Sequence, residues 1–126
     1  MTNNIDTIFD HVTFNDKGLV PVIAQCQHSG EVLMMAWMNK EALMHTIETG
    51  QVCYYSRSRQ ALWRKGETSG HTQELVSLTL DCDGDTILAK VNQIGPACHT
   101  NRKTCFFKLI DPSDHTITIT QDVQPA

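Results

Sequence analysis

One helical segment with a capping residue at each end restricts the fold of this chain more than any other sequence feature. Asn39 has the side chain of a helix N-cap, and the segment 40–49 carries apolar residues at positions 43, 44 and 47, which share one helical face. Gly50 suits the left-handed residue that ends a helix. Much of the remaining chain consists of short apolar runs between turn-forming residues. One main helix among several strands predicts an α+β fold.

The short apolar runs predict β-strands, because they contain β-branched or alternating apolar residues and are bounded by turn signals. The predicted strands are residues 19–26, 32–37, 52–55, 74–80, 86–91, 104–110 and 115–120, the last at a sheet edge. The turn-rich link 28–31 predicts that the first two strands form a hairpin, and Asp83-Gly84 predicts a second tight turn. The polar segment 56–73 predicts a long loop, which in a small domain is usually functional or disordered.

The length of 126 residues suits a single domain with its own core. We predict a small mixed β-sheet or half-barrel. Residues 1–13 would form an N-terminal arm or short helix, and residues 111–126 would form a C-terminal edge strand and tail.

Charge and hydropathy argue against several classes of partner. The formal net charge of -4 does not suit a nucleic-acid module, which usually has a basic face. No run approaches the ~18 apolar residues of a membrane span, and the N-terminus lacks the pattern of a signal peptide. We therefore expect a cytoplasmic protein without nucleic-acid or membrane partners. Five cysteines in a reducing compartment indicate thiols or metal ligands rather than disulfides, with Cys26 and Cys53 as small buried residues.

Two sets of metal-ligand side chains occur within residues 81–105. Carboxylates are hard ligands for magnesium or calcium, whereas thiols are soft ligands that zinc binds at ~2.3 Å. The carboxylates are Asp81, Asp83 and Asp85, and the thiols are Cys82, Cys98 and Cys105.

The three carboxylates favour a bound cation whether the segment 81–85 is extended or forms a turn, because unneutralised charges at this spacing repel each other. The alternative is an acidic turn that faces solvent. The segment is not an EF-hand loop, since Thr86 and Asn92 stand where that loop needs glycine and a bidentate glutamate.

The thiol spacing lacks the C-x2-C pair of most structural zinc sites. Three cysteines without an obvious fourth ligand indicate an open coordination position, where zinc can activate water. In the alternative, His99 is the fourth ligand of a closed structural site. Because neighbouring side chains such as Cys98 and His99 rarely reach the same ion, His99 is assigned more weight as a nearby general base or acid.

Basic residues gather around an aromatic one in the polar segment 56–73. Guanidinium groups match phosphate oxygens, and an indole can stack on a base, so the segment suits a nucleotide-like ligand. The alternative is a solvated loop with Trp63 anchored in the core. The basic residues are Arg57, Arg59, Arg64 and Lys65, and His71 lies on the far side of the same segment.

An ordered set of motifs resembles the phosphoribosyl-AMP cyclohydrolase family of histidine biosynthesis, and the resemblance extends from about residue 18 to residue 107. The motifs are GLVPVIAQ (18–25), GEVLMMAWMN (30–39), YSRSR (55–59), LWRKGETSGHTQ (62–73), DCDGD (81–85) and ACHTNRKTC (97–105). Asn101 and Thr104 differ from the usual family residues, but asparagine tolerates the left-handed conformation and threonine keeps a hydroxyl group.

The resemblance implies hydrolysis of the adenine ring of 1-(5-phosphoribosyl)-AMP between N1 and C6, which yields the phosphoribosylformimino-aminoimidazole carboxamide ribotide. It also implies an intertwined homodimer with one zinc ion per subunit, bound by Cys82 of one chain and by Cys98 and Cys105 of the other. The carboxylates Asp81, Asp83 and Asp85 match the family's magnesium ligands.

The chemistry expected from the residues agrees with this reaction. Alkylation at N1 makes C6 electrophilic, and zinc-activated water can attack it. His99 is the first candidate for the base and His71 the second. Magnesium, Arg57, Arg59 and Lys65 are expected to bind the phosphates, and Trp63 the base. The competing hypothesis is a zinc-stabilised nucleotide-binding module without catalysis.

Overall fold

The computed structural model describes residues 5–121 and 123. The predicted N-terminal arm and C-terminal tail thus lie partly outside the described residues. The elements in chain order are α1 (Ile5–Asp10), β1 (Val20–Cys26), β2 (Val32–Met38), α2 (Lys40–Thr49), β3 (Cys53–Ser56), β4 (Ala61–Arg64), β5 (Gln73–Leu80), β6 (Ile87–Gln93), β7 (Lys108–Asp111) and β8 (Thr116–Ile119).

Helix α2 begins and ends as predicted. The Asn39 side chain accepts a hydrogen bond from the backbone N–H of Ala42 at 2.8 Å, and Gly50 is left-handed with φ 74°. The backbone N–H of Gly50 donates to the carbonyl oxygen of Thr46 at 2.9 Å. Both caps satisfy backbone groups that a helix end otherwise leaves without partners.

The buried face of α2 differs from the predicted one. Ala42, Leu43 and Thr46 are the buried residues, whereas Met44 is half-buried. Thr46 is buried although it is polar, because its hydroxyl accepts a hydrogen bond from the N–H of Cys53 at 2.9 Å. This bond ties the helix to β3.

The main sheet is mixed, as predicted, with the strand order β2-β1-β6-β5. Strands β1 and β2 form the predicted antiparallel hairpin, β5 and β6 form another, and β1 pairs with β6 in parallel. The α+β class with one main helix is therefore confirmed.

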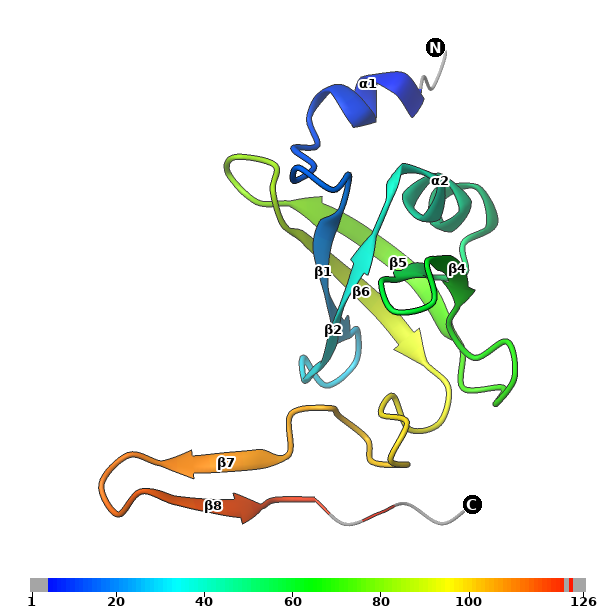
Figure 1. Ribbon diagram of the computed structural model, residues 1–126. Coiled ribbons are helices and arrows are strands. Elements are labelled where there is room, and N and C mark those ends of the chain that lie inside the picture. Colours follow the sequence, from blue (N-terminus) through cyan, green and yellow to red (C-terminus); the bar gives the residue numbers. More distant parts are fainter. Residues whose placement is uncertain (1–4, 122, 124–126) are drawn as a thin grey trace.

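One face of this sheet forms the core. Val22 pairs with Ile87 and Ala24 with Ala89 across β1 and β6, and all four side chains are buried. Because successive side chains in a strand point to opposite faces, the intervening residues face the other side. Helix α2 and the β3–β4 hairpin lie on the core side of the sheet (Figure 1).

Two sequence predictions are wrong in part. The predicted loop 56–73 contains strand β4, which pairs with β3, because Trp63 packs on Tyr54 with ring centroids 5.6 Å apart. The predicted strand 104–110 is regular only from Lys108 onward. The preceding segment stays irregular because buried Thr104 bonds the carbonyl oxygen of Val32 at 2.8 Å instead of joining a ladder.

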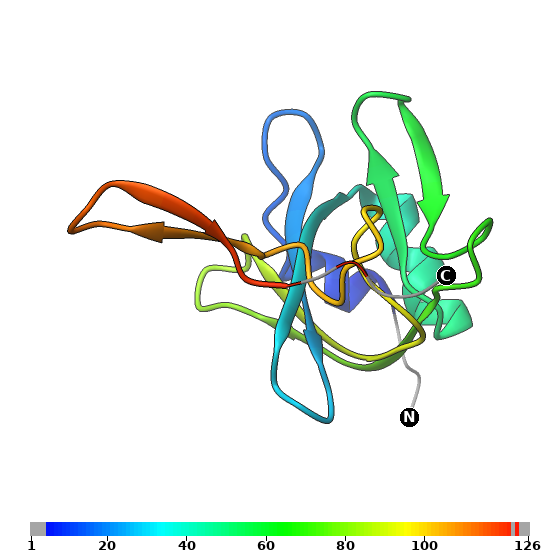
Figure 2. The same ribbon diagram turned by 90° about the horizontal axis from the view of Figure 1, so that it is seen from below.

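Strands β7 and β8 form a separate hairpin that projects from the body (Figure 2). The edge strand predicted near the C-terminus is thus part of a two-stranded arm, not of the main sheet. Within the described residues, no helix is long and apolar enough to span a membrane.

Candidate functional site

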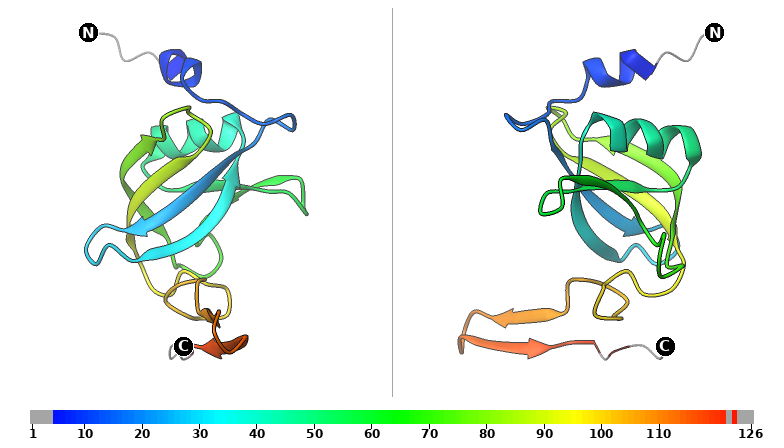
Figure 3. Two further views of the ribbon diagram at one scale, coloured as in Figure 1. Left: turned by 90° about the vertical axis from the view of Figure 1, so that its left-hand side faces the viewer. Right: turned by 45° about the vertical axis from the view of Figure 1, so that its right-hand side comes forward.

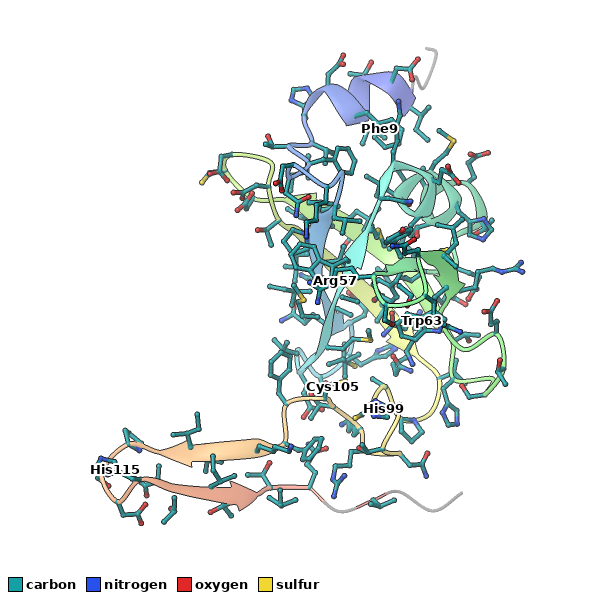
Figure 4. The ribbon with its side chains drawn as sticks, viewed as in Figure 1. Phe9, Arg57, Trp63, His99, Cys105 and His115 are labelled. Atoms are coloured by element: carbon teal, nitrogen blue, oxygen red, sulfur yellow. The ribbon has the colours of Figure 1, made fainter. Side chains whose placement is uncertain are left out.

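A cleft of about 300 Å³ gathers six of the twelve candidate site residues that the sequence singled out. It lies between the β3–β4 hairpin with its following turn and the loop after β6. Figure 4 shows Trp63 on one side and His99 with Cys105 towards the lower end of the molecule. The cleft is lined by Arg59, Trp63, Lys65, Gly66, Glu67, Thr68, Ser69, His71, Pro96, Cys98, His99 and Asn101.

Trp63 packs against the core and also lines the cleft. One side of the half-buried indole packs on the buried ring of Tyr54, and the indole also lines the cleft. The ammonium group of Lys65 lies 5.6 Å from the centre of the indole ring. Trp63 is therefore a rigid wall whose remaining surface is available to a flat ligand.

Lys65 is an unusual lysine because only 9% of its surface is exposed. Burial lowers its pKa, and the neighbouring sulfurs of Cys105 and Cys98 act in the opposite direction. A positive charge is thus held close to both thiols and to the cleft.

His71 is held by two glycines that the sequence analysis did not single out. A Cβ atom on Gly95 would lie 2.5 Å from Cδ2 of the imidazole, and one on Gly66 would lie 2.5 Å from the backbone of His71. Both glycines have positive φ, 71° and 83°. Only residues without a side chain fit here, so the close approach fixes the imidazole at the cleft wall.

Cys98 belongs to a tight loop that follows β6. The N–H of Cys98 donates to the carbonyl oxygen of Arg102 at 3.1 Å, and Asn101 has the left-handed φ of 66° that its residue type tolerates. The hydroxyl of Thr100 lies 3.0 Å from the Cys98 sulfur, and the Thr100 N–H donates to the same sulfur at 3.5 Å.

A side-chain hydrogen bond between Cys98 and Cys105 affects the pKa values of both thiols. Burial acts to raise the pKa of Cys98, but hydrogen bonds from Thr100 and Cys105 outweigh it and keep that pKa below its ordinary value. Burial and the negative charge of Cys98 raise the pKa of Cys105 to about 11. Cys98 therefore loses its proton more easily than Cys105.

Cys82 lies at the opposite end of the sheet from this pair. It is an exposed residue of the β5–β6 turn, and Cys98 follows the other end of β6. The seven residues of β6 span roughly 23 Å at about 3.3 Å per residue. Among the described residues of one chain, the three thiols therefore do not surround a common point.

The three carboxylates do come together. Ligand oxygens of Asp81, Asp83 and Asp85 lie within 4.8 Å of one another in the exposed β5–β6 turn. The Asp83-Gly84 turn is formed as predicted, so the extended alternative for this segment is wrong.

Hydrogen bonds within this turn shift the pKa values of Asp81 and Asp85 in opposite directions. Hydrogen bonds to Asp83 and Asp81 raise the pKa of Asp85. Desolvation acts to raise the pKa of Asp81, but hydrogen bonds from the side chain and N–H of Asp85 outweigh it and lower that pKa. Asp81 is therefore a stronger acid than Asp85, although both carboxylates are exposed.

The segment before β1 contacts the acidic turn through its backbone. The sequence pattern did not predict this contact. The N–H of Thr13 donates to the carbonyl oxygen of Gly84 at 2.7 Å. A Cβ atom on Gly84 would lie 2.1 Å from the carbonyl oxygen of His11. Glycine is needed here for close backbone approach as well as for the turn.

Arg57 and Arg59 lie on different sides of the turn between β3 and β4. Arg59 lines the main cleft. The guanidinium group of Arg57 lies 5.0 Å from the centre of the Trp37 ring, and Arg57 lines a separate cleft with Lys17. The structure therefore does not bring these two arginines together in one cleft.

A buried network of polar side chains lies behind the cleft, and the sequence did not predict it. The Tyr54 hydroxyl donates to the side-chain oxygen of Gln73 at 2.6 Å, and the Gln73 amide donates to Gln93 at 2.8 Å. It links β3, β5 and β6 just beside the segment that carries His71.

Comparison with known proteins places this chain among well-defined relatives. The family model of phosphoribosyl-AMP cyclohydrolase matches residues 34–107. A protein named phosphoribosyl-AMP cyclohydrolase from Alkalilimnicola ehrlichii is 53% identical over 97% of this chain and 86% of its own length. Proteins of the same name from Granulibacter bethesdensis and Rhodospirillum rubrum are 54% and 64% identical, over 90% and 81% of this chain and 89% and 71% of their own lengths. The chain therefore belongs to the phosphoribosyl-AMP cyclohydrolase family of hydrolases.

Proposed function

We propose that this chain hydrolyses the N1–C6 bond of 1-(5-phosphoribosyl)-AMP, as a step of histidine biosynthesis, with zinc-activated water as the nucleophile. The observation that carries the proposal is the single cleft into which Trp63, Lys65, His71, Cys98 and His99 all face. An aromatic wall, a buried cation, two imidazoles and a sulfur ligand are the groups that this reaction needs.

The thiols suit zinc by their chemistry. A side-chain hydrogen bond links Cys98 and Cys105. The Thr100 N–H donates to the Cys98 sulfur at 3.5 Å, and the Thr100 hydroxyl lies 3.0 Å from the same sulfur. Such donors orient a sulfur ligand and moderate its charge. We propose that Cys98 and Cys105 of one subunit and Cys82 of a second bind one zinc ion, in a homodimer with one such site per subunit.

The carboxylates suit magnesium. Asp81, Asp83 and Asp85 offer only oxygen ligands, and they lie close together at the surface, where a cation and a phosphate can both reach them. We propose that they bind magnesium and, through it, a phosphate of the substrate. The alternative of an acidic turn facing solvent predicts no specific effect of magnesium on substrate affinity.

Zinc, when bound, supplies Lewis-acid activation of water near pH 7. The water oxygen attacks C6, the N1–C6 bond breaks, and N1 gains a proton while C6 becomes a carboxamide carbon. One group must accept the proton of the water and a proton must reach N1. We assign this transfer first to His99, which adjoins Cys98, and second to His71 on the facing wall of the cleft.

The remaining cleft residues bind and orient the substrate. Trp63 offers the exposed part of its indole to the base, and Lys65 and Arg59 offer positive charge to a phosphate. Arg57, together with Lys17 in the adjacent cleft, is proposed for the second phosphate that this substrate carries. These assignments divide the two phosphates between the two sides of the β3–β4 turn.

The decisive experiment combines metal content by mass spectrometry with the ultraviolet change on adding phosphoribosyl-AMP. The parent enzyme is expected to contain zinc and to open the ring, and Cys98→Ser is expected to lose both properties. Cys26→Ser is the matched control, because Cys26 is half-buried and lies outside the cleft. Turnover by a zinc-free Cys98→Ser enzyme would contradict the mechanism. Zinc and nucleotide binding by the parent without an ultraviolet change would favour the non-catalytic binding module.

A further inference from the structure

A series of polar side chains leads from β3 to the wall of the cleft. The Tyr54 hydroxyl donates to Oε1 of Gln73 at 2.6 Å, and Nε2 of Gln73 donates to Oε1 of Gln93 at 2.8 Å. Nε2 of Gln93 donates in turn to the carbonyl oxygen of Ile94 at 3.2 Å. The Gln73 amide also donates to the sulfur of Met34 at 3.4 Å. Tyr54 and Gln73 are fully buried, and we call the series from Tyr54 to Ile94 the Gln73 network.

The donors and acceptors of the Gln73 network fit together in one way. The carbonyl oxygen of Ile94 only accepts, so the Gln93 amide must donate to it and present its oxygen to Gln73. Gln73 must then donate to Gln93 and accept from Tyr54. Burial raises the pKa of Tyr54, and the negative charge of Cys105 acts in the same direction, so the phenol keeps the proton that it donates. The orientations of both amides therefore follow from the network itself.

The network joins two strand ends that enclose the His71 imidazole. Gln73 and Gln93 form the last pair of the β5–β6 ladder, and beyond them the N–H of Ile94 donates to the segment before β5 at 3.0 Å. A Cβ atom on Gly95, the next residue, would lie 2.5 Å from Cδ2 of the imidazole. The right view of Figure 3 shows the green segment before β5 beside the yellow end of β6. The position of the imidazole therefore depends on how these two ends are held together.

The other end of the network supports the opposite wall of the cleft. The ring of Tyr54 packs on the Trp63 indole, with ring centroids 5.6 Å apart and planes tilted by 40°. Gln73 thus connects the wall that contains Trp63 with the wall that contains His71. Because buried hydrogen bonds keep to a narrow range of lengths and angles, one side chain bonded towards both walls sets their spacing.

We propose that Gln73 is a positioning residue that fixes the His71 imidazole relative to Trp63, by binding Tyr54 on one side and the end of β6, through Gln93, on the other. The side chain of Gln73 is fully buried, so it acts through other residues and not on the substrate. The inference rests on the proposed function only for its effect on turnover. There, a misplacement of about 1 Å in a group that transfers a proton can cost about 100-fold in rate.

The test uses three variants that change the network and leave every residue of the cleft in place. Tyr54→Phe removes only the phenol hydroxyl and keeps the ring beneath Trp63. Gln73→Met keeps the length of the side chain without its amide. The double variant removes both partners of the 2.6 Å bond, so neither is left buried and unsatisfied. Thr46→Val is the matched control, because it removes an equally buried hydroxyl that bonds to β3 outside the network.

Two properties are measured for each variant. The signals of His71 in a ¹H–¹³C spectrum without substrate, assigned with His71→Gln, report the position of the imidazole, and the ultraviolet change gives kcat and KM. All three network variants are expected to move the His71 signals and to lower kcat at least about tenfold, with KM within about threefold of the parent value. Thr46→Val is expected to change neither property.

Stability separates positioning from a purely structural role. The double variant is expected to resist urea better than Tyr54→Phe, because it leaves no buried acceptor at residue 73, but it should not regain kcat. A double variant in which kcat recovers together with stability overturns the proposal. Unmoved His71 signals in Tyr54→Phe and in the double variant overturn it as well. Moved signals with an unchanged kcat confirm the positioning and remove His71 from the proposed mechanism. A parent that opens no ring overturns the proposed function, while the spectra still decide what positions His71.

Discussion

At the scale of single residues, the geometry of the candidate site depends on glycines as well as on the side chains proposed for the chemistry. Gly95 lets the imidazole of His71 rest against the backbone of the loop that also carries Cys98. Gly84 lets the segment before β1 approach the acidic turn in the same way. In both places the absence of a side chain allows a close approach beside a candidate site residue.

Gly95→Ala is expected to displace His71, because the added methyl group would lie 2.5 Å from the imidazole Cδ2 atom. If His71 takes part in proton transfer, kcat should fall at least about tenfold. The histidine signals in a ¹H–¹³C spectrum should show the displacement independently of turnover.

Gly70→Ala is the matched control for this change. Gly70 has a similar φ of 80°, but no atom lies within 4 Å of its added Cβ. Both variants place an alanine in the left-handed conformation, which costs about 1–2 kcal/mol. Only Gly95→Ala also brings a methyl group against the His71 imidazole. Equal kcat values for the two variants would remove His71 from the mechanism.

At the scale of elements, the sequence predicts what local pattern determines and misses what tertiary packing determines. The bounds of α2 follow from Asn39 and Gly50, and the β1–β2 hairpin follows from alternating apolar residues. Strand β4 was not predicted because its segment is polar. Trp63 is its one partly buried residue, through the contact with Tyr54. The grouping of cleft residues depends on that strand, so the predicted site was a list of residues without their arrangement.

The buried hydroxyl that joins α2 to β3 supports a test at this scale. Thr46→Val keeps the shape of the side chain but leaves the N–H of Cys53 without its 2.9 Å partner in a buried position. We expect the free energy of unfolding in urea to fall by about 1–3 kcal/mol, the usual cost of an unsatisfied buried donor.

Thr49→Val is the comparison, since it makes the same change at an exposed position of the same helix. Its hydroxyl also bonds backbone groups, including the carbonyl oxygen of His45 at 2.8 Å, but water can replace those bonds. A loss below about 0.5 kcal/mol is expected there. Similar losses for the two variants would mean that the Thr46 bond is not what holds the helix to β3.

At the scale of the whole molecule, one strand separates the two halves of the proposed zinc site. Cys82 precedes β6 and Cys98 follows it, so an extended strand keeps the two sulfurs apart in any single chain. The sequence could have shown this separation from the strand prediction alone. It could not show the apolar sheet face and the projecting hairpin, because both depend on which strands pair.

This separation predicts that two inactive variants will restore each other. Cys82→Ser and Cys98→Ser each damage every site of their own homodimer if the site is shared. In a mixed dimer, one site receives both substitutions and the other receives neither. After subunit exchange in an equal mixture, half of the dimers are mixed, so about a quarter of the sites should be intact. Zinc content and the ultraviolet rate should both recover to about that fraction of the parent value.

A mixture of Cys98→Ser with Cys105→Ser is the control, because both ligands come from the same chain, and no mixed dimer of these two contains an intact site. Recovery in that control, or its absence in the first mixture despite proven exchange, would place all three sulfurs of a working site differently from the arrangement proposed here.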